Sequence, residues 1–154
     1  MRTMHRNIVA ALLFSKDNKL FMALRDSDGG GVYVDTWQIP GGGIEKNETK
    51  EEAIIREIAE ETGIDIANKR LILVDDTGQG KAEKTLRETG ERVVVAMDFY
   101  VYKVQLPMNS DAIDVVLGDE FTSFRWFALS ALPHLNLAPP SRALFKKLHY
   151  LPEL

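Results

Sequence analysis

The sequence predicts a protein of the α/β class. Runs of Val, Leu, Ile, Phe and Tyr with the length of strands lie on either side of a segment that has the periodicity of a helix. The 154 residues are enough for one domain with a real core, and no internal repeat or linker divides them. We therefore expect a single domain that spans residues 1–154.

The N-terminal third is predicted to form strands separated by turns. Asn7–Phe14 and Leu20–Arg25 are apolar runs of strand length, with a turn at Lys16–Asn18 between them. Asp26–Asp35 contains three consecutive glycines and is predicted to be a mobile surface loop. Trp37–Pro40 is predicted to be a short strand that leads into a glycine loop, and the absence of Cβ atoms in that loop allows close approach of a ligand.

The helix that follows the glycine loop carries the clearest signals. Thr49 and Glu52 have the spacing of a capping box, so the helix should begin near Lys50. Gly63 stands where a left-handed residue would end it. At about 100° per residue, the isoleucines form one stripe that can face a core. The remaining arc holds three carboxylates, from Glu57, Glu60 and Glu61.

The second half of the chain is predicted to add three strands and one helix. The strands are Asn68–Val74, the long Arg92–Gln105 and Phe124–Phe127. The polar segment Asp75–Glu91 is predicted to be a long loop, which would cover the substrate or make subunit contacts. After loop 106–118 and the irregular segment 135–140, Ser141 is expected to cap a helix with the apolar stripe Leu144, Phe145 and Leu148.

Two interpretations of the acidic arc are open on composition alone. A run of charge on a helix is usually a solvated face. However, Glu57 and Glu61 repel each other at i,i+4, and they lie near the helix C-terminus, where the helix dipole disfavours negative charge. A bound divalent cation would relieve both problems, and carboxylate oxygens suit Mg²⁺ or Mn²⁺.

The spacing around this helix resembles the complete Nudix box. Gly42 is followed by Glu48 six residues on and by Arg56 to Ile64 eight residues after that, which fills every fixed position of the pattern G-x5-E-x7-R-E-U-x-E-E-x-G-U, where U is a bulky aliphatic residue. The box covers 23 of the 154 residues. A looser similarity extends to Trp37–Pro40 before the box and to Glu120 and Trp126 after it.

The resemblance implies a Nudix fold, in which a mixed β-sheet lies between helices in an α/β/α arrangement. It also assigns roles to individual residues. The metal ligands would be the carbonyl of Gly41 and the three carboxylates of the arc. Glu48 and Arg56 would form an ion pair that braces the loop of Gly42 and Gly43 against the helix. The residues implied in catalysis are these: Arg56, Glu57, Glu60 and Glu120. Arg25 would meet substrate phosphate, whereas at a strand end it would otherwise be an ordinary solvated charge.

The resemblance implies metal-dependent hydrolysis of a nucleoside diphosphate linked to another group. Mg²⁺ would be the usual cofactor, with Mn²⁺ as a substitute. In its small size the chain resembles the MutT-like pyrophosphatases of the family. These enzymes convert a nucleoside or deoxynucleoside triphosphate to a monophosphate and pyrophosphate. Hydrolysis of ADP-ribose, nucleotide sugars or dinucleoside polyphosphates is the alternative. By the same resemblance, the general base would be one of the box glutamates or Glu120. A glutamate at the position of Glu120 is otherwise an ordinary loop carboxylate.

Two other classes of function are compatible with the fold. Some related modules bind nucleotides without catalysis, but such modules commonly lack glutamates of the box, and this chain keeps all of them. Related isomerases of isoprenoid diphosphates tend to use a catalytic cysteine, and the chain has none.

Composition restricts the partners and the location. The net charge of −4 and the pI near 5.4 argue against non-specific binding to nucleic acid or to an anionic membrane. The absence of cysteine rules out a disulfide frame, and the apolar run Ile8–Phe14 is too short and lacks the cleavage site of a signal peptide. We expect a cytoplasmic protein with a nucleotide as substrate, no nucleic acid or membrane partner, and a homodimer as an open alternative.

Overall fold

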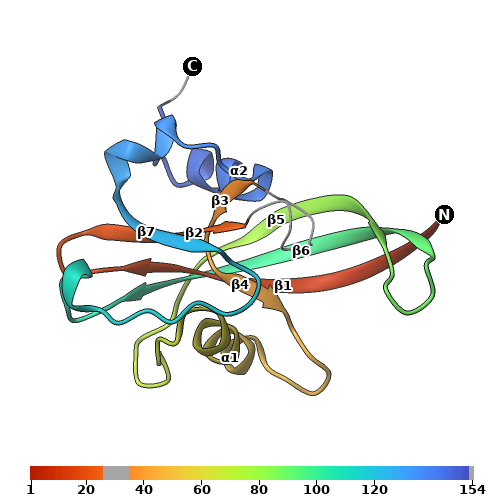
Figure 1. The fold of residues 1–154 in the computed structure, drawn as a ribbon, viewed down its shortest axis with the longest axis horizontal. Helices are drawn as coiled ribbons and strands as arrows, with labels where there is room; N and C mark the ends of the chain where they lie inside the picture. Colours follow the sequence, from red (N-terminus) through yellow and green to blue (C-terminus); the bar gives the residue numbers. More distant parts are fainter. Residues whose placement is uncertain (26–34, 153–154) are drawn as a thin grey trace.

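The computed structural model describes residues 1–25 and 35–152, and its described strands form one mixed sheet (Figure 1). Along the sheet the order is β3-β2-β1-β6-β5, while β4 pairs with β1 and β7 pairs with β2. The strands are β1 Arg2–Phe14, β2 Lys19–Arg25, β3 Thr36–Gln38, β4 Gly41–Gly43, β5 Ile72–Thr85, β6 Arg92–Gln105 and β7 Ser123–Ala128. The helices are α1 Lys50–Thr62 and α2 Pro139–Lys147, with 3₁₀ turns η1 Ser110–Ala112 and η2 Leu129–His134.

The two α-helices cover opposite faces of the sheet (Figure 1). Side chains alternate between faces along a strand, so β1 contributes to two separate cores. Val9 and Ala11 pack with Ile54 and Ile58 of α1. Ala10 and Leu12 pack with Leu144 and Phe145 of α2. The predicted mixed sheet between helices is confirmed.

Strand β1 is longer than predicted because it pairs in parallel with β6. The register runs from Arg2 opposite Val93 to Phe14 opposite Gln105. The polar residues Arg2–Asn7 lack the apolar pattern on which the prediction relied, and they are strand only through this pairing with a distant segment.

The prediction of a loop at Asp75–Glu91 is wrong. Most of the segment belongs to β5, an edge strand that pairs antiparallel with β6 from Ile72 to Thr85, and only the turn at 86–91 is irregular. An edge strand with many exposed residues keeps a polar composition. Register shifts near Asp75 and two glycines further weaken the strand signal. Likewise, the strand predicted at Asn68–Val74 begins only at Ile72.

Other predicted boundaries need smaller corrections. The glycine loop at 41–43 is strand β4, paired antiparallel with β1 from Ile8 to Ala10. Ala138, and not Ser141, is the N-cap of α2, because Pro139 and Pro140 fill its first turn and Ser141 is buried inside the helix. The predicted mobile loop Asp26–Asp35 lies, except for Asp35, outside the described residues. Within the described ranges, no helix combines the length and apolar character needed to cross a bilayer.

Candidate active site

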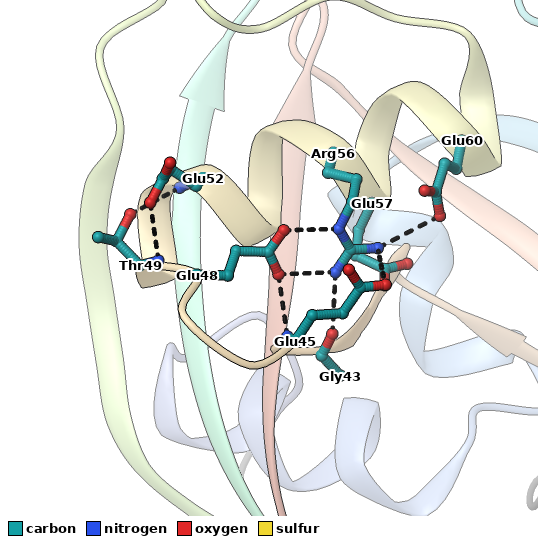
Figure 2. Close-up of polar contacts among 8 residues, drawn as sticks. All are labelled: Gly43, Glu45, Glu48, Thr49, Glu52, Arg56, Glu57 and Glu60. Atoms are coloured by element: carbon teal, nitrogen blue, oxygen red, sulfur yellow. Dashed lines mark hydrogen bonds and ion pairs between the residues drawn. The ribbon is translucent and has the colours of Figure 1, made fainter.

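Helix α1 begins and ends where its capping residues predict. The Thr49 hydroxyl accepts a hydrogen bond from the backbone N–H of Glu52 at 3.1 Å, and the Glu52 carboxylate accepts one from the N–H of Thr49 at 2.9 Å (Figure 2). Gly63 ends the helix with a φ of 72°, a left-handed conformation that favours glycine. These caps fix which way each glutamate of the helix points.

The three carboxylates of the predicted arc have different environments. Glu61 is 4% exposed. The side chain of Glu57 is 13% exposed, and that of Glu60 is 58% exposed. Only Glu60 therefore resembles the solvated face that composition alone suggests, while the other two carboxylates are held inside the protein.

Strand β4 provides the surface against which the two inner carboxylates lie. The backbone N–H of Gly41 donates to Oε1 of Glu61 at 2.7 Å. The carboxylate of Glu57 lies directly over Gly42, in the space that a Cβ atom at that position would fill. A glycine is needed at Gly42 so that this carboxylate can contact the strand backbone.

Arg56 connects β4, the following loop and α1 (Figure 2). Its guanidinium donates to both oxygens of Glu48, at 2.7 and 2.9 Å, and to the carbonyl of Gly43 at 3.0 Å. It also donates to Glu57 at 2.8 Å and to Glu60 at 3.3 Å. The hydrogen bond from Arg56 lowers the pKa of Glu48 to about 2. The Arg56 guanidinium thus holds the loop to the helix and partly neutralises the acidic arc.

Burial raises the pKa of both inner carboxyls. The pKa of Glu61 rises to about 9, mainly because the group is desolvated and secondarily because Glu120 and Glu57 are negatively charged. Desolvation also raises the pKa of Glu57, against the opposing effect of Arg56. Carboxyls buried in this way favour a bound cation, which would restore their ionised form.

The donors fit a hard divalent cation by their chemistry. All of them are oxygens, and Oε2 of Glu61 is buried without a hydrogen-bond partner. Across residues 1–25 and 35–152, however, no three acidic, histidine or cysteine side chains are grouped closely enough to hold a metal ion. In this arrangement the Arg56 guanidinium contacts both Glu57 and Glu60 (Figure 2).

Arg25 and Glu120 come together from β2 and from the segment before β7. Nη2 of Arg25 donates to Oε2 of Glu120 at 2.9 Å, and the guanidinium lies 5.3 Å from the centre of the Phe121 ring. The Arg25 side chain is 15% exposed, and its Nε is buried without a hydrogen-bond partner. Arg25 is therefore held at the site by Glu120.

A cavity of about 500 Å³ joins these groups to the sheet. Gly41–Gly43, Glu57, Arg25 and Glu120 line one part of it. Another part is lined by β1, β6 and β5, and contains residues that the sequence-based reasoning did not single out: Arg6, Ile8, Met97, Phe99, Gly78 and Lys147.

Phe99 lines this cavity from β6. It pairs with Gly78, and a Cβ atom at Gly78 or Gly80 would lie 3.3 or 3.2 Å from Phe99 atoms. The ring therefore covers the places where two side chains of β5 would stand. The alternating glycines of β5 are the signal for this contact in the sequence, although glycines in a polar segment also favour a loop.

A family-wide sequence profile described as NUDIX domain matches residues 4–148. The chain belongs to this family. The resemblance predicted from the box is confirmed, and so is the assignment of the chain to the Nudix hydrolases. Members of the family generally need a divalent metal.

Curated relatives of this Nudix protein divide into two kinds of match. Nucleoside triphosphatase NudI of Escherichia coli is 27% identical over 140 residues, covering 89% of this chain and 92% of the relative. An RNA pyrophosphohydrolase of Hydrogenovibrio crunogenus is 35% identical over 68 residues, covering 44% of this chain and only 38% of the relative. That second match spans little more than a third of the relative's length.

The solved structures agree with the fold. The crystal structure of a MutT protein from Methanosarcina mazei Go1 superposes with a TM-score of 0.68 and covers 97% of this chain and 96% of that one. The sequence identity is 23%, so this similarity supports the Nudix fold alone.

Proposed function

We propose that this Nudix protein hydrolyses a nucleoside or deoxynucleoside triphosphate to the monophosphate and pyrophosphate, with Mg²⁺ as cofactor and Mn²⁺ as a possible substitute. One observation carries the proposal. The buried carboxylate of Glu61 and the largely buried one of Glu57 meet a glycine strand at one side of a cavity that Phe99 also lines. The match to NudI, named a nucleoside triphosphatase, extends over most of both chains and supports the same substrate class.

The proposed ligands of the cation are Glu57, Glu60, Glu61 and the carbonyl of Gly41. When bound there, a divalent cation supplies charge neutralisation for the diphosphate oxygens and activation of water. Arg56 keeps the loop and the helix in register while it contacts Glu57 and Glu60. Glu60, whose side chain is exposed, would exchange its contact with Arg56 for the cation.

The chain's own groups carry the remaining steps. The guanidinium of Arg25, which lines the cavity, is a donor for a phosphate oxygen. The attacking water passes its proton to a carboxylate, and the candidates are Glu57, Glu60 and Glu120. Positioning and neutralisation supply most of the acceleration in transfers of this kind.

The apolar part of the cavity suits the base of a nucleotide. Its volume is in the range of small-molecule sites, which is about 300–1,000 Å³. A nucleobase stacks well on an open aromatic face, and such stacking contributes about 1–3 kcal/mol. Phe99 lines the cavity on β6, two strands across the sheet from β4.

The experiment that tests this function is a substrate screen. Purified protein with Mg²⁺ is incubated with nucleoside triphosphates, ADP-ribose, nucleotide sugars and dinucleoside polyphosphates, and the released phosphate species are identified. Pyrophosphate released from a triphosphate supports the proposal. Turnover of only another class, or of none, overturns it. The cytoplasmic location, the homodimer and the absence of nucleic-acid partners stay predictions.

A further inference from the structure

The basic side chains that line the cavity differ in whether they have an acidic partner. Arg25 is paired with Glu120 at 2.9 Å. Lys147 is paired with Asp75 at 3.3 Å. Arg6 and Lys84 also line the cavity, and within residues 1–25 and 35–152 neither has an ion pair or a hydrogen bond from its side chain. An unpaired guanidinium beside a cavity is available to an anionic ligand.

Arg6 lies at the side of the cavity where the carboxylates are. A Cβ atom at Gly43 would collide with the guanidinium of Arg6, so this group is seated against the glycine strand. The carbonyl of the same glycine accepts a hydrogen bond from Arg56 at 3.0 Å. Two arginines therefore contact one residue of β4, but Arg56 is occupied by glutamates whereas Arg6 is not.

The strand register explains why Arg6 faces the cavity. Ile8 and Ala10 line the cavity from β1, and Arg6 precedes Ile8 by two residues, so all three share one face. The neighbouring residues are Gly43, opposite Ile8 on β4, and Met97, opposite Arg6 on β6. The guanidinium thus lies beside the glycine strand, and Arg6 is paired with the apolar residue Met97 of β6.

We propose that Arg6 binds a phosphoryl group of the substrate and selects for polyphosphate ligands. The inference rests on the proposed function, because it takes the anion to be the phosphate of a nucleotide. A planar guanidinium can donate two parallel hydrogen bonds to one phosphate. Neither the sequence pattern of the box nor the loop residues around it include this position.

The chain offers a matched control for the test. Arg2 lies four residues earlier on the same face of β1, is paired with Glu91 at 2.9 Å and does not line the cavity. Arg6→Ala, Arg6→Lys and Arg2→Ala are compared with the wild type. Thermal melts show whether each variant is folded, and the lysine variant keeps the charge where the alanine variant does not.

Two measurements are made on each variant: steady-state kinetics on nucleoside triphosphates with Mg²⁺, and calorimetric binding of inorganic tripolyphosphate and of unphosphorylated nucleosides. For Arg6→Ala we expect KM to rise roughly 10-fold or more with kcat little changed, because ground-state and transition-state binding are lost together. In Arg6→Ala, tripolyphosphate binding should weaken in parallel, whereas nucleoside binding should not. Arg6→Lys should recover part of the loss in KM and in tripolyphosphate binding. Arg2→Ala should behave as wild type.

Each other result decides against the proposal or against the wider function. An unchanged KM and unchanged tripolyphosphate binding in Arg6→Ala overturn the role of Arg6. So does an equal loss in Arg2→Ala, which would indicate a general charge effect. Weaker nucleoside binding with intact tripolyphosphate binding would place Arg6 on the base and overturn the phosphate contact. If the wild type hydrolyses no triphosphate but binds tripolyphosphate through Arg6, the function fails and the anion site stands.

Discussion

Glu61 shows how strongly one position can depend on its surroundings. It is on the same helix as Glu60, one residue away, yet it is buried and hydrogen-bonded to Gly41 while Glu60 is exposed. Its pKa of about 9, against an ordinary value of 4.5, means that the metal-free protein holds a proton there at neutral pH.

This raised pKa predicts a pH-dependent stability in metal-free protein. Above the ordinary pKa the unfolded chain releases the proton of Glu61 and the folded chain keeps it, so stability should fall as pH rises from about 4.5 toward 9. Glu61→Gln keeps an acceptor for Gly41 without the titration. We expect the variant to be at least about 1.4 kcal/mol more stable than wild type at pH 8, the equivalent of one pKa unit.

Denaturant unfolding at pH 5 and pH 8 in a chelator measures this difference. Equal pH dependence in wild type and variant would show that Glu61 does not carry the buried proton.

The two inner carboxylates also give a catalytic prediction. Glu57→Gln or Glu61→Gln should cut Mg²⁺-dependent turnover by at least about 100-fold while the protein stays folded, because the amide cannot neutralise a divalent cation. Initial rates measure the turnover, and circular dichroism shows whether each variant is folded. Glu51→Gln, at an exposed position of the same helix, serves as the control. Full activity in both inner variants would remove the metal-helix hypothesis.

For single residues, the sequence is informative where a residue belongs to a motif of fixed spacing. The box points to the glutamates, to Gly42 and to Arg56 because their offsets are specific. Phe99 and Arg6 belong to no such pattern, and their place in the cavity depends on the pairing of β1, β6 and β5. Such pairing is long-range information that local periodicity does not contain.

Among the elements, β4, its loop and α1 behave as one braced unit. Arg56 is the brace, since it bonds Glu48 in the loop, Gly43 in the strand and Glu57 in the helix. Arg56→Ala should loosen the loop, lower turnover by about 10- to 100-fold and raise the Mg²⁺ concentration needed for half-maximal rate.

Hydrogen exchange of amides 42–49 and Mg²⁺ titrations of the rate measure the effect of Arg56→Ala. Arg56→Lys keeps the charge but not the forked geometry, so its turnover should lie between those of the wild type and Arg56→Ala. An unchanged rate together with an unchanged Mg²⁺ requirement would contradict the bracing role.

Helix α1 could be predicted to the residue because its caps are local, whereas β5 could not. The capping box of Thr49 and Glu52 and the left-handed Gly63 are contacts within a few residues. Strand β5 is a strand only because β6 lies beside it, and its polar, glycine-containing sequence is typical of a loop. The same reasoning applies to the N-terminal half of β1.

For the whole molecule, the cation should act as a stabilising ligand. A ligand at 100 times its Kd stabilises the folded state by about 2.7 kcal/mol, which corresponds to a Tm rise of roughly 5–10 °C for a domain of this size. We expect Mg²⁺ to raise Tm in the wild type and to have little effect on Glu57→Gln. Differential scanning calorimetry with Mg²⁺ and with chelator measures this. A rise of the same size in the variant would mean that the ion binds elsewhere.

The parallel partnership of β1 with β6 has a consequence for the order of events during synthesis. Strand β1 has early partners in β2 and β4 along one edge, but its parallel partner is complete only after residue 105 has been made, since Phe14 is opposite Gln105. Strand β4 hydrogen-bonds to β1, and the inner glutamates rest on β4. The strand that supports β4 therefore keeps one edge open until β6 is made, and a nascent chain that stalls before β6 should lack a stable functional centre.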